Sequence, residues 1–149
     1  MSISRRSMLA LSGGAAAALV AMRAMPAYAD ADAAMDAVRS FAGGEPATGP
    51  IRLDAPEIAE NGNTVPISVS VESDMAEDNY VESVAVFADG NPAPEVVVFN
   101  FTPMSGEAAA TTRMRLAQTQ HVIAVAKMSN GDVFMDKREV KVTIGGCGG

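Results

Sequence analysis

Apolar and polar positions alternate along much of this chain, most regularly in residues 64–72. Every second residue there is apolar and the residues between are polar or small, which is the pattern of a half-buried strand. The apolar set is Val65, Ile67, Val69 and Val71. Because proline donates no backbone hydrogen bond, Pro66 indicates that this strand lies at a sheet edge or that the proline stands at its very start.

Further strands are predicted by apolar runs and by the turn residues between them. Asn130–Gly131 is the strongest hairpin signal, because both central positions of the turn typical of Asn-Gly need positive φ. The predicted strands are residues 80–88, 95–102, 111–117, 121–128 and 132–144. Six or seven short strands indicate an all-β fold, an immunoglobulin-like antiparallel β-sandwich. A partly closed barrel is the alternative that the pattern leaves open.

The predicted domain covers residues 30–144. A short N-terminal helix is expected over residues 31–41, where Ala34, Val38 and Phe41 recur at helical spacing and Gly43–Gly44 ends the run. At the other end, the last strand is expected to point three apolar residues inward and to stop abruptly at the glycines. These residues are Val140, Val142 and Ile144.

Residues 1–29 have the composition of an export signal. They contain three arginines and no acidic residue, and Ala27-Tyr28-Ala29 supplies a cleavage site after an apolar stretch. Arg5–Arg6 and their neighbours resemble the twin-arginine pattern. The prediction is a cleaved twin-arginine signal peptide and a periplasmic mature protein. A membrane anchor is the alternative, disfavoured because glycines and Arg23 interrupt the apolar stretch.

The mature chain is strongly acidic. Removal of residues 1–29 takes away three of the 11 basic residues and none of the 18 acidic ones, so the formal charge becomes −10. Such a surface repels phosphate backbones and gives free small anions no long-range attraction. Neither nucleic acid nor a membrane is expected as a partner.

No cofactor or metal site is expected from the side chains of the mature chain. His121 is the only histidine, and one histidine without a nearby acidic cluster falls short of the three or four ligands that metal sites use. It is interpreted as a structural residue. Met114 and Met128 lie in apolar runs and are expected to fill the core. No Ser/His/Asp set indicates catalysis, so no catalytic residue is assigned.

The chain ends in a glycine-rich segment that contains its only cysteine, Cys147. Glycine adopts both signs of φ, so residues 145–149 are predicted to form a flexible arm. Its glycines are Gly145, Gly146, Gly148 and Gly149. The three residues from Ile144 to Cys147 span about 10 Å. Small neighbours suit a thiol that enters the narrow active site of another protein.

The surroundings of Cys147 in the sequence leave its thiol unactivated. Residues 142–149 contain no Lys, Arg or His, whereas reactive thiolates lie beside cations, helix N-termini or metals. Activation is therefore expected from a partner's site. Three functions stay open at this point: a covalent carrier, an exported immunoglobulin-like binding or scaffold domain that cross-links through its thiol, and a thiol enzyme. The last is disfavoured, since no base is near the tail.

Three segments resemble the SoxY family, the sulfur-carrier subunit of the bacterial Sox thiosulfate-oxidation system. They are the closing "VKVTIGGCGG" of residues 140–149, "PEIAENGNTVPISVSVES" of residues 56–73 and "FADGNPAPEVVVFNFTP" of residues 87–103. The resemblance covers nearly the whole mature chain. It implies that Cys147 is the site of covalent substrate attachment and that the glycine arm carries it from one enzyme to the next.

The resemblance also implies partners and a role without catalysis. A SoxZ-like β-subunit would form a periplasmic heterodimer with this chain. Transient contacts are implied with the c-type cytochrome complex SoxAX, which couples thiosulfate to the thiol, with the hydrolase SoxB and with the sulfane dehydrogenase SoxCD. The carrier itself would be no enzyme. The exposed faces of residues 96–101 and of the last sheet are the candidate surfaces for the partner subunit.

Overall fold

The structure is a computed structural model that describes residues 30–145. The predicted signal peptide and residues 146–149 lie outside the described residues. The elements in chain order are α2 (Ala31–Ala42), β1 (Ile51–Asp54), β2 (Ile58–Ala59), β3 (Val65–Val71), β4 (Val81–Ala88), β5 (Glu95–Asn100), the 3₁₀ turn η1 (Pro103–Ser105), β6 (Ala108–Met114), β7 (Gln120–Met128) and β8 (Val133–Val142). None of the described helices is long and apolar enough to cross a membrane.

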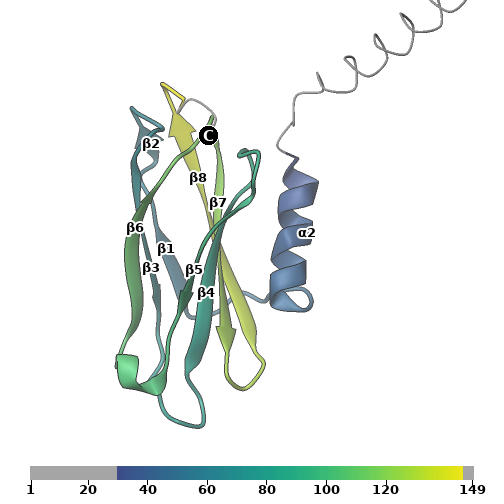
Figure 1. Cartoon of the computed structure of the whole chain (residues 1–149), viewed down its shortest axis with the longest axis vertical. Coiled ribbons are helices and arrows are strands. Elements are labelled where there is room, and N and C mark those ends of the chain that lie inside the picture. The colour runs from purple at the N-terminus through teal and green to yellow at the C-terminus, as the bar shows by residue number, and fades with distance from the viewer. Residues whose placement is uncertain (1–29, 146–149) are drawn as a thin grey trace, which may run out of the picture.

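Two sheets face each other across one core (Figure 1). The smaller sheet has the strand order β1-β3-β6, and the larger has the order β2-β8-β7-β4-β5. Neighbouring strands are antiparallel except for the two-residue β2, which is parallel to β8. The prediction of an all-β, immunoglobulin-like sandwich is confirmed.

The alternating pattern of β3 is confirmed, and Pro66 explains where that strand begins. Val65, Ile67 and Val69 are at most 2% exposed and face the core. Although β3 is the central strand of its sheet, β1 pairs only with residues 68–71. Glu72 N donates to Pro50 O on the β1 side, and by the two-residue repeat of a strand the nitrogen of Pro66 faces the same side. Because β1 does not reach residue 66, the missing N–H costs no ladder hydrogen bond.

The helix α2 covers the outer face of the larger sheet, beside β4 and β7 (Figure 1). Asp30 caps its first turn by accepting a hydrogen bond from Asp32 N, and Gly43 ends it with φ 75°. Val38 packs against the outward side chains of β4 and β7, and Phe41 meets Phe87 edge to face, with centroids 6.1 Å apart. Burial on both faces explains why these two strands are apolar almost throughout.

Two details of the predicted strands are wrong. Only Gly131 has positive φ in the Asn-Gly hairpin, because Met128 N donates to Asp132 O (2.9 Å) across a three-residue loop rather than a two-residue one. The strand expected at residues 111–117 runs from Ala108 to Met114. Its first residues pair with the end of β3, and the chain leaves the ladder after Met114 although alternation continues to the buried Leu116.

Candidate functional site

The end of β8 determines where the thiol-bearing segment leaves the domain. Beyond Val142, Thr143 N donates to Ala59 O (3.1 Å) and Thr143 Oγ1 donates to Glu60 O (3.0 Å). The carbonyl of Ile144 then accepts from Gly62 N (2.8 Å). In the range that the structure covers, backbone pairing of the C-terminal strand thus extends as far as Ile144. Cys147, Gly146, Gly148 and Gly149 lie outside the described residues.

The side chain of Ile144 corrects one expectation. Val140 is fully buried and Val142 half-buried, but Ile144 is 68% exposed instead of pointing inward. The regular ladder with β2 ends at Val142 and the backbone bends at residues 143 and 144, so the side chain of Ile144 no longer follows the inward alternation although its carbonyl is still hydrogen-bonded. Ile58, which pairs with Lys141 at the same end, is also exposed, at 59%. Two large apolar side chains therefore face outward near the exit of the chain.

The loop that contains Gly62 holds the backbone at the end of β8 by hydrogen bonds. Gly62 uses both backbone groups: its N–H binds Ile144 O, and its carbonyl accepts from Leu116 N (2.8 Å). Asn63 N donates to the side-chain oxygen of Asn61 (2.9 Å), which holds the loop in shape. The "ENGNT" segment thus joins the end of β8 to the segment that follows β6.

Gly145 lies directly beside the backbone carbonyl of Ala117. A Cβ placed on it would lie 2.3 Å from Ala117 O, far inside contact distance. Any side chain at this position would displace either Ala117 or the end of β8. The glycine is therefore required by a close approach of two backbones, in addition to the freedom for which the sequence predicts it.

Side-chain hydrogen bonds hold the backbone around Ala117 in place. Asn91 accepts from Ala117 N (3.1 Å) and donates to Arg115 O (2.8 Å). The buried Gln120 accepts from Gly90 N (2.7 Å) and donates to Asn91 Oδ1 (2.9 Å). The turn at residues 89–94 and the segment at residues 115–120 therefore form one connected unit beside Gly145. Sequence reasoning missed this unit, since its parts are some 30 residues apart.

His121 belongs to the same end of the sandwich and has a structural partner. Its ring Nδ1 lies 2.9 Å from Asp89 Oδ2, and its backbone N donates to Asp89 Oδ1 (2.8 Å). Asp89 thereby ties the turn after β4 to the start of β7. Residues 30–145 contain no group of three or more His, Cys, Asp or Glu side chains that could hold a metal ion.

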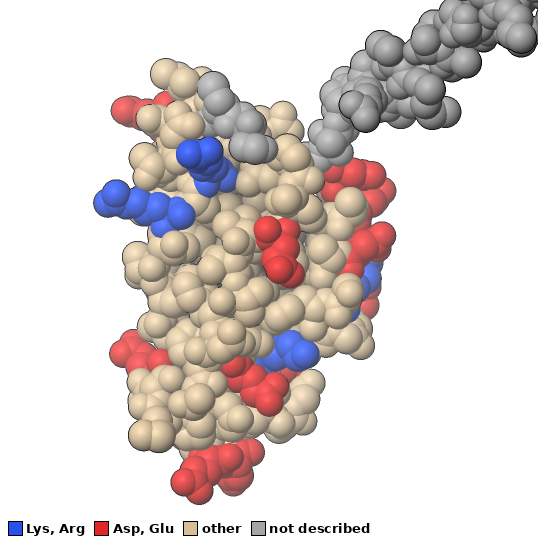
Figure 2. All heavy atoms as spheres, in the orientation of Figure 1, with Lys and Arg blue, Asp and Glu red and all other residues tan. Residues whose placement is uncertain are grey.

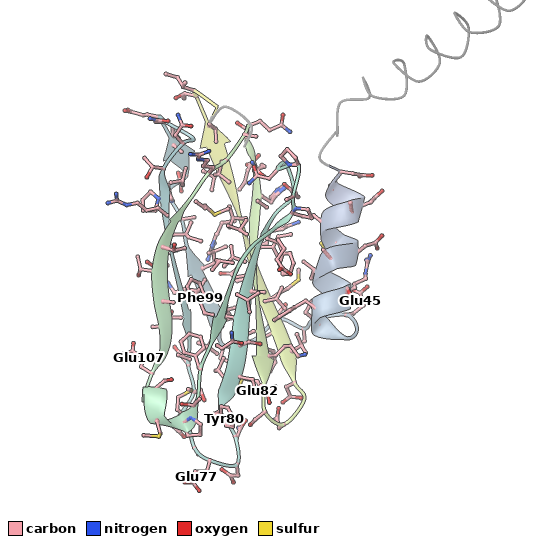
Figure 3. All side chains as sticks on the ribbon, in the orientation of Figure 1. Glu45, Glu77, Tyr80, Glu82, Phe99 and Glu107 are labelled. Carbon is pink, nitrogen blue, oxygen red and sulfur yellow. The ribbon has the colours of Figure 1, made fainter. Side chains whose placement is uncertain are left out.

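Charge is unevenly distributed along the sandwich (Figure 2). On the face shown, basic side chains lie over the upper part of β6, and the lower end is acidic. Glu77, Glu82 and Glu107 lie in the lower half of the molecule, away from the end of β8 (Figure 3). That lower end also holds an open cavity of about 690 Å³, lined by four acidic side chains, which would repel an anionic ligand. They are Glu72, Asp74, Asp78 and Asp132.

The fold and this end define a class of protein: a β-sandwich that anchors its last strand firmly and carries a single thiol just beyond the anchor. Comparison with protein families gives the family. Residues 38–147 match the family described as "Sulfur oxidation protein SoxY", a range that ends at Cys147. The chain belongs to the SoxY family.

Solved structures agree with this assignment. The sulfur carrier protein SoxY from Chlorobium limicola f thiosulfatophilum is 32% identical, with a TM-score of 0.60 over 73% of this chain and 94% of that one. Superoxide reductase (neelaredoxin) from Ignicoccus hospitalis has a TM-score of 0.56 at 19% identity, over 64% of this chain and 81% of that one. The latter likeness concerns the fold alone. A search of curated proteins finds no match.

Proposed function

We propose that this chain is a non-enzymatic covalent carrier of sulfur intermediates in thiosulfate oxidation, with Cys147 as the attachment site. The observation that carries the proposal is the firm anchor at Ile144, three residues before the only cysteine. The thiol is close enough to the domain to be presented and far enough from it to enter another protein. The family match through Cys147 and the solved structure of a sulfur carrier protein support it.

The proposed chemistry needs an electron acceptor that this chain does not supply. Oxidative coupling joins the thiol sulfur to the outer sulfur of thiosulfate: R–SH + S₂O₃²⁻ gives R–S–S–SO₃⁻, one proton and two electrons. In the family's pathway the electrons go to the c-type cytochrome complex SoxAX. Hydrolysis by SoxB then gives R–S–SH, sulfate and a proton, and SoxCD oxidises the remaining outer sulfur. The carrier's part is to hold the sulfur atoms between these steps.

Covalent attachment suits the acidity of the domain. At a formal charge of −10 the mature chain gives free thiosulfate no long-range attraction, and the acidic cavity at the lower end of the sandwich would repel the anion. A covalent bond keeps the intermediate on the carrier whatever the sign of the surface charge. Residues 145–149 would act as the swinging arm that moves the bound sulfur from one active site to the next.

The carrier proposal is tested at Cys147. Cys147→Ser should abolish thiosulfate oxidation in cells and leave the urea unfolding midpoint of the mature chain unchanged. Intact-mass measurement of protein from cells grown on thiosulfate should find sulfur-containing adducts on the C-terminal peptide. A mixed disulfide with another protein would instead favour a scaffold that cross-links through its thiol, and turnover by the purified chain would favour an enzyme.

We also propose that a SoxZ-like subunit pairs along the edge strand β5. The edge of β1 is closed by β8, because Asp136 accepts from Leu53 N (2.9 Å) and Arg138 Nε donates to Leu53 O (3.3 Å). On the other side of the larger sheet, β8 is covered by Ala47, by β1 and by the two-residue β2. β5 and β6 therefore remain as the long open edges of the described sheets. Three valines of β5 are half-buried or exposed, whereas the outward residues of β6 are small or polar. An apolar edge suits a permanent partner.

This interface is tested with one charge on each open edge. Val98 is 36% exposed on β5, so Val98→Lys should leave the fold intact and abolish copurification of the partner from the native host. Ala109→Lys places the same charge on an exposed position of β6 and should leave copurification unchanged. The opposite result would assign the interface to β6.

Export through the twin-arginine route, and hence a periplasmic location, is part of the same proposal. A signal that exports folded proteins would let this chain carry a partner that has no signal of its own. Replacing Arg5 and Arg6 with lysine should then leave both subunits in the cytoplasmic fraction. A partner that still reaches the periplasm would show that the two subunits travel separately.

A further inference from the structure

Two arginines at the exit end of the sandwich have no acidic partner among the described residues. Arg113 and Arg115 are exposed and alternate with the buried Met114 and Leu116, so both point outward from the smaller sheet. The other three arginines of the described residues each form an ion pair with an acidic side chain. These are Arg39, Arg52 and Arg138.

The surroundings of these arginines favour an anion from outside the domain. β6 is an edge strand, and the residue opposite Arg113 on β3 is the uncharged Pro66. By contrast, Lys141 on the other sheet follows Glu139 on the same face of β8. His121 is paired with Asp89. The side chains of Arg113 and Arg115 therefore form an outward-facing basic site near the exit that makes no ion pair with a carboxylate of the described residues.

Chain connectivity brings this basic site within reach of the thiol. Arg115 lies two residues before Ala117, whose carbonyl abuts Gly145. Cys147 lies two residues beyond Gly145, and two residues span at most about 7 Å. A long guanidinium side chain can therefore meet a group carried on the Cys147 sulfur.

We propose that Arg113 and Arg115 form a docking site for the sulfonate group carried on Cys147, so that the loaded C-terminal segment rests against β6 between enzyme encounters. The inference rests on the proposed carrier function. The adduct R–S–S–SO₃⁻ ends in three oxygens that share one negative charge and match the donor fork of a guanidinium. The free thiol carries no such charge, so docking distinguishes the loaded carrier from the empty one. Exposed ion pairs are weak, which leaves the segment free to depart.

The test loads the mature chain chemically. Tetrathionate transfers the same group to a thiolate: R–S⁻ + S₄O₆²⁻ gives R–S–S–SO₃⁻ + S₂O₃²⁻, with atoms and charge balanced. In the double variant Arg113→Gln/Arg115→Gln, the rate constant for loading at low salt should fall about three- to tenfold, because two positive charges near the dianion are lost. The difference should disappear near 1 M salt, where the Debye length is about 3 Å.

Controls separate charge from structure. Arg52→Gln removes an exposed arginine of the same sheet that already pairs with Asp54, and it should load at the wild-type rate. Iodoacetamide is neutral and should alkylate Cys147 equally fast in all variants. In the wild-type protein, loading should shift the Nε–Hε NMR resonances of Arg113 and Arg115 and leave that of Arg52 in place.

Equal tetrathionate rates in wild type and double variant, or equal resonance shifts after neutral alkylation, would overturn the docking site. Either result would leave the carrier function standing if Cys147 adducts are found in cells. Absence of those adducts during growth on thiosulfate would instead refute the carrier function itself, whatever the arginines do in vitro.

Discussion

Gly145→Ala is the change that best tests the anchored exit of the C-terminal segment. The new Cβ would lie 2.3 Å from Ala117 O, and Cβ contacts below 3.0 Å essentially do not occur, so a shift of about 0.7 Å or more is required. Ala117 is held by Asn91, and the residue before Gly145 is held by Gly62. The weaker restraint must yield. We expect this to be the single hydrogen bond between Gly62 N and Ile144 O.

The cost follows from that one bond. A backbone hydrogen bond contributes about 0.5–1.5 kcal/mol net, so exchange of the Gly62 amide should accelerate between about twofold and tenfold. Global stability, measured by urea unfolding of the mature chain, should fall by no more than about 1.5 kcal/mol. Gly44→Ala is the control, because a Cβ there meets nothing within 4 Å and the change should stay within about 0.5 kcal/mol.

A second comparison separates packing from flexibility. If Gly145 were needed only for the flexibility of the chain, Gly148→Ala would affect sulfur transfer as much as Gly145→Ala. Neither change would then alter hydrogen exchange of the Gly62 amide. We expect only Gly145→Ala to accelerate that exchange. Equal exchange rates in Gly145→Ala and Gly44→Ala would refute the close approach as a restraint on the exit.

Three further predictions concern the same end of the sandwich. Gln120→Ala should lower the free energy of unfolding by about 1–3 kcal/mol in urea titrations, because the Gly90 N–H loses its buried acceptor. Leu116→Ala should cost about 2–5 kcal/mol by the same measurement, since Leu116 is fully buried, while Leu116→Met should cost less than about 1.5 kcal/mol. Ile144→Ser should leave stability within about 0.5 kcal/mol, because its side chain is exposed. Under the proposed carrier function, partner enzymes would meet this side chain beside the thiol, so the change should slow thiosulfate-dependent cytochrome reduction in a reconstituted system.

The local pattern of apolar and polar residues was sufficient to predict most strands of the sandwich and the helix. The runs that became β3, β4, β5 and β7 alternate or stay apolar over six to nine residues, long enough for a period to be read. β8 has four consecutive charged residues in its middle, and it was predicted from the Asn-Gly turn before it and the alternation at its C-terminal end. β1 has four residues and β2 has two, so neither carries a readable period. The pairing of β2 with β8 joins residues 83 positions apart, and only the fold brings them together.

For the candidate site, too, some features can be predicted from the sequence and others depend on the fold. Cys147 and its glycines could be recognised from the sequence because they are adjacent in it. The role of Gly145 could not, since the contact that requires glycine comes from Ala117, 28 residues earlier. Likewise, the sequence around Cys147 has no cation within five residues, but the fold places Arg115 at the exit. Which charges lie near the thiol is therefore determined by the fold and not by distance along the sequence.

The short distance between anchor and thiol gives weak contacts a large effect. If the proposed arm pivots at Gly145, Cys147 would sample a sphere of about 7 Å radius, which corresponds to a local concentration on the order of 1 M and exceeds the millimolar values typical of flexible linkers between binding modules. Two exposed ion pairs worth about 0.5 kcal/mol each would then favour the docked form by roughly fivefold. A partner's active site needs only slightly more binding energy to take the sulfonate away. A longer arm would lose this balance, because its lower local concentration would leave the same two arginines mostly empty.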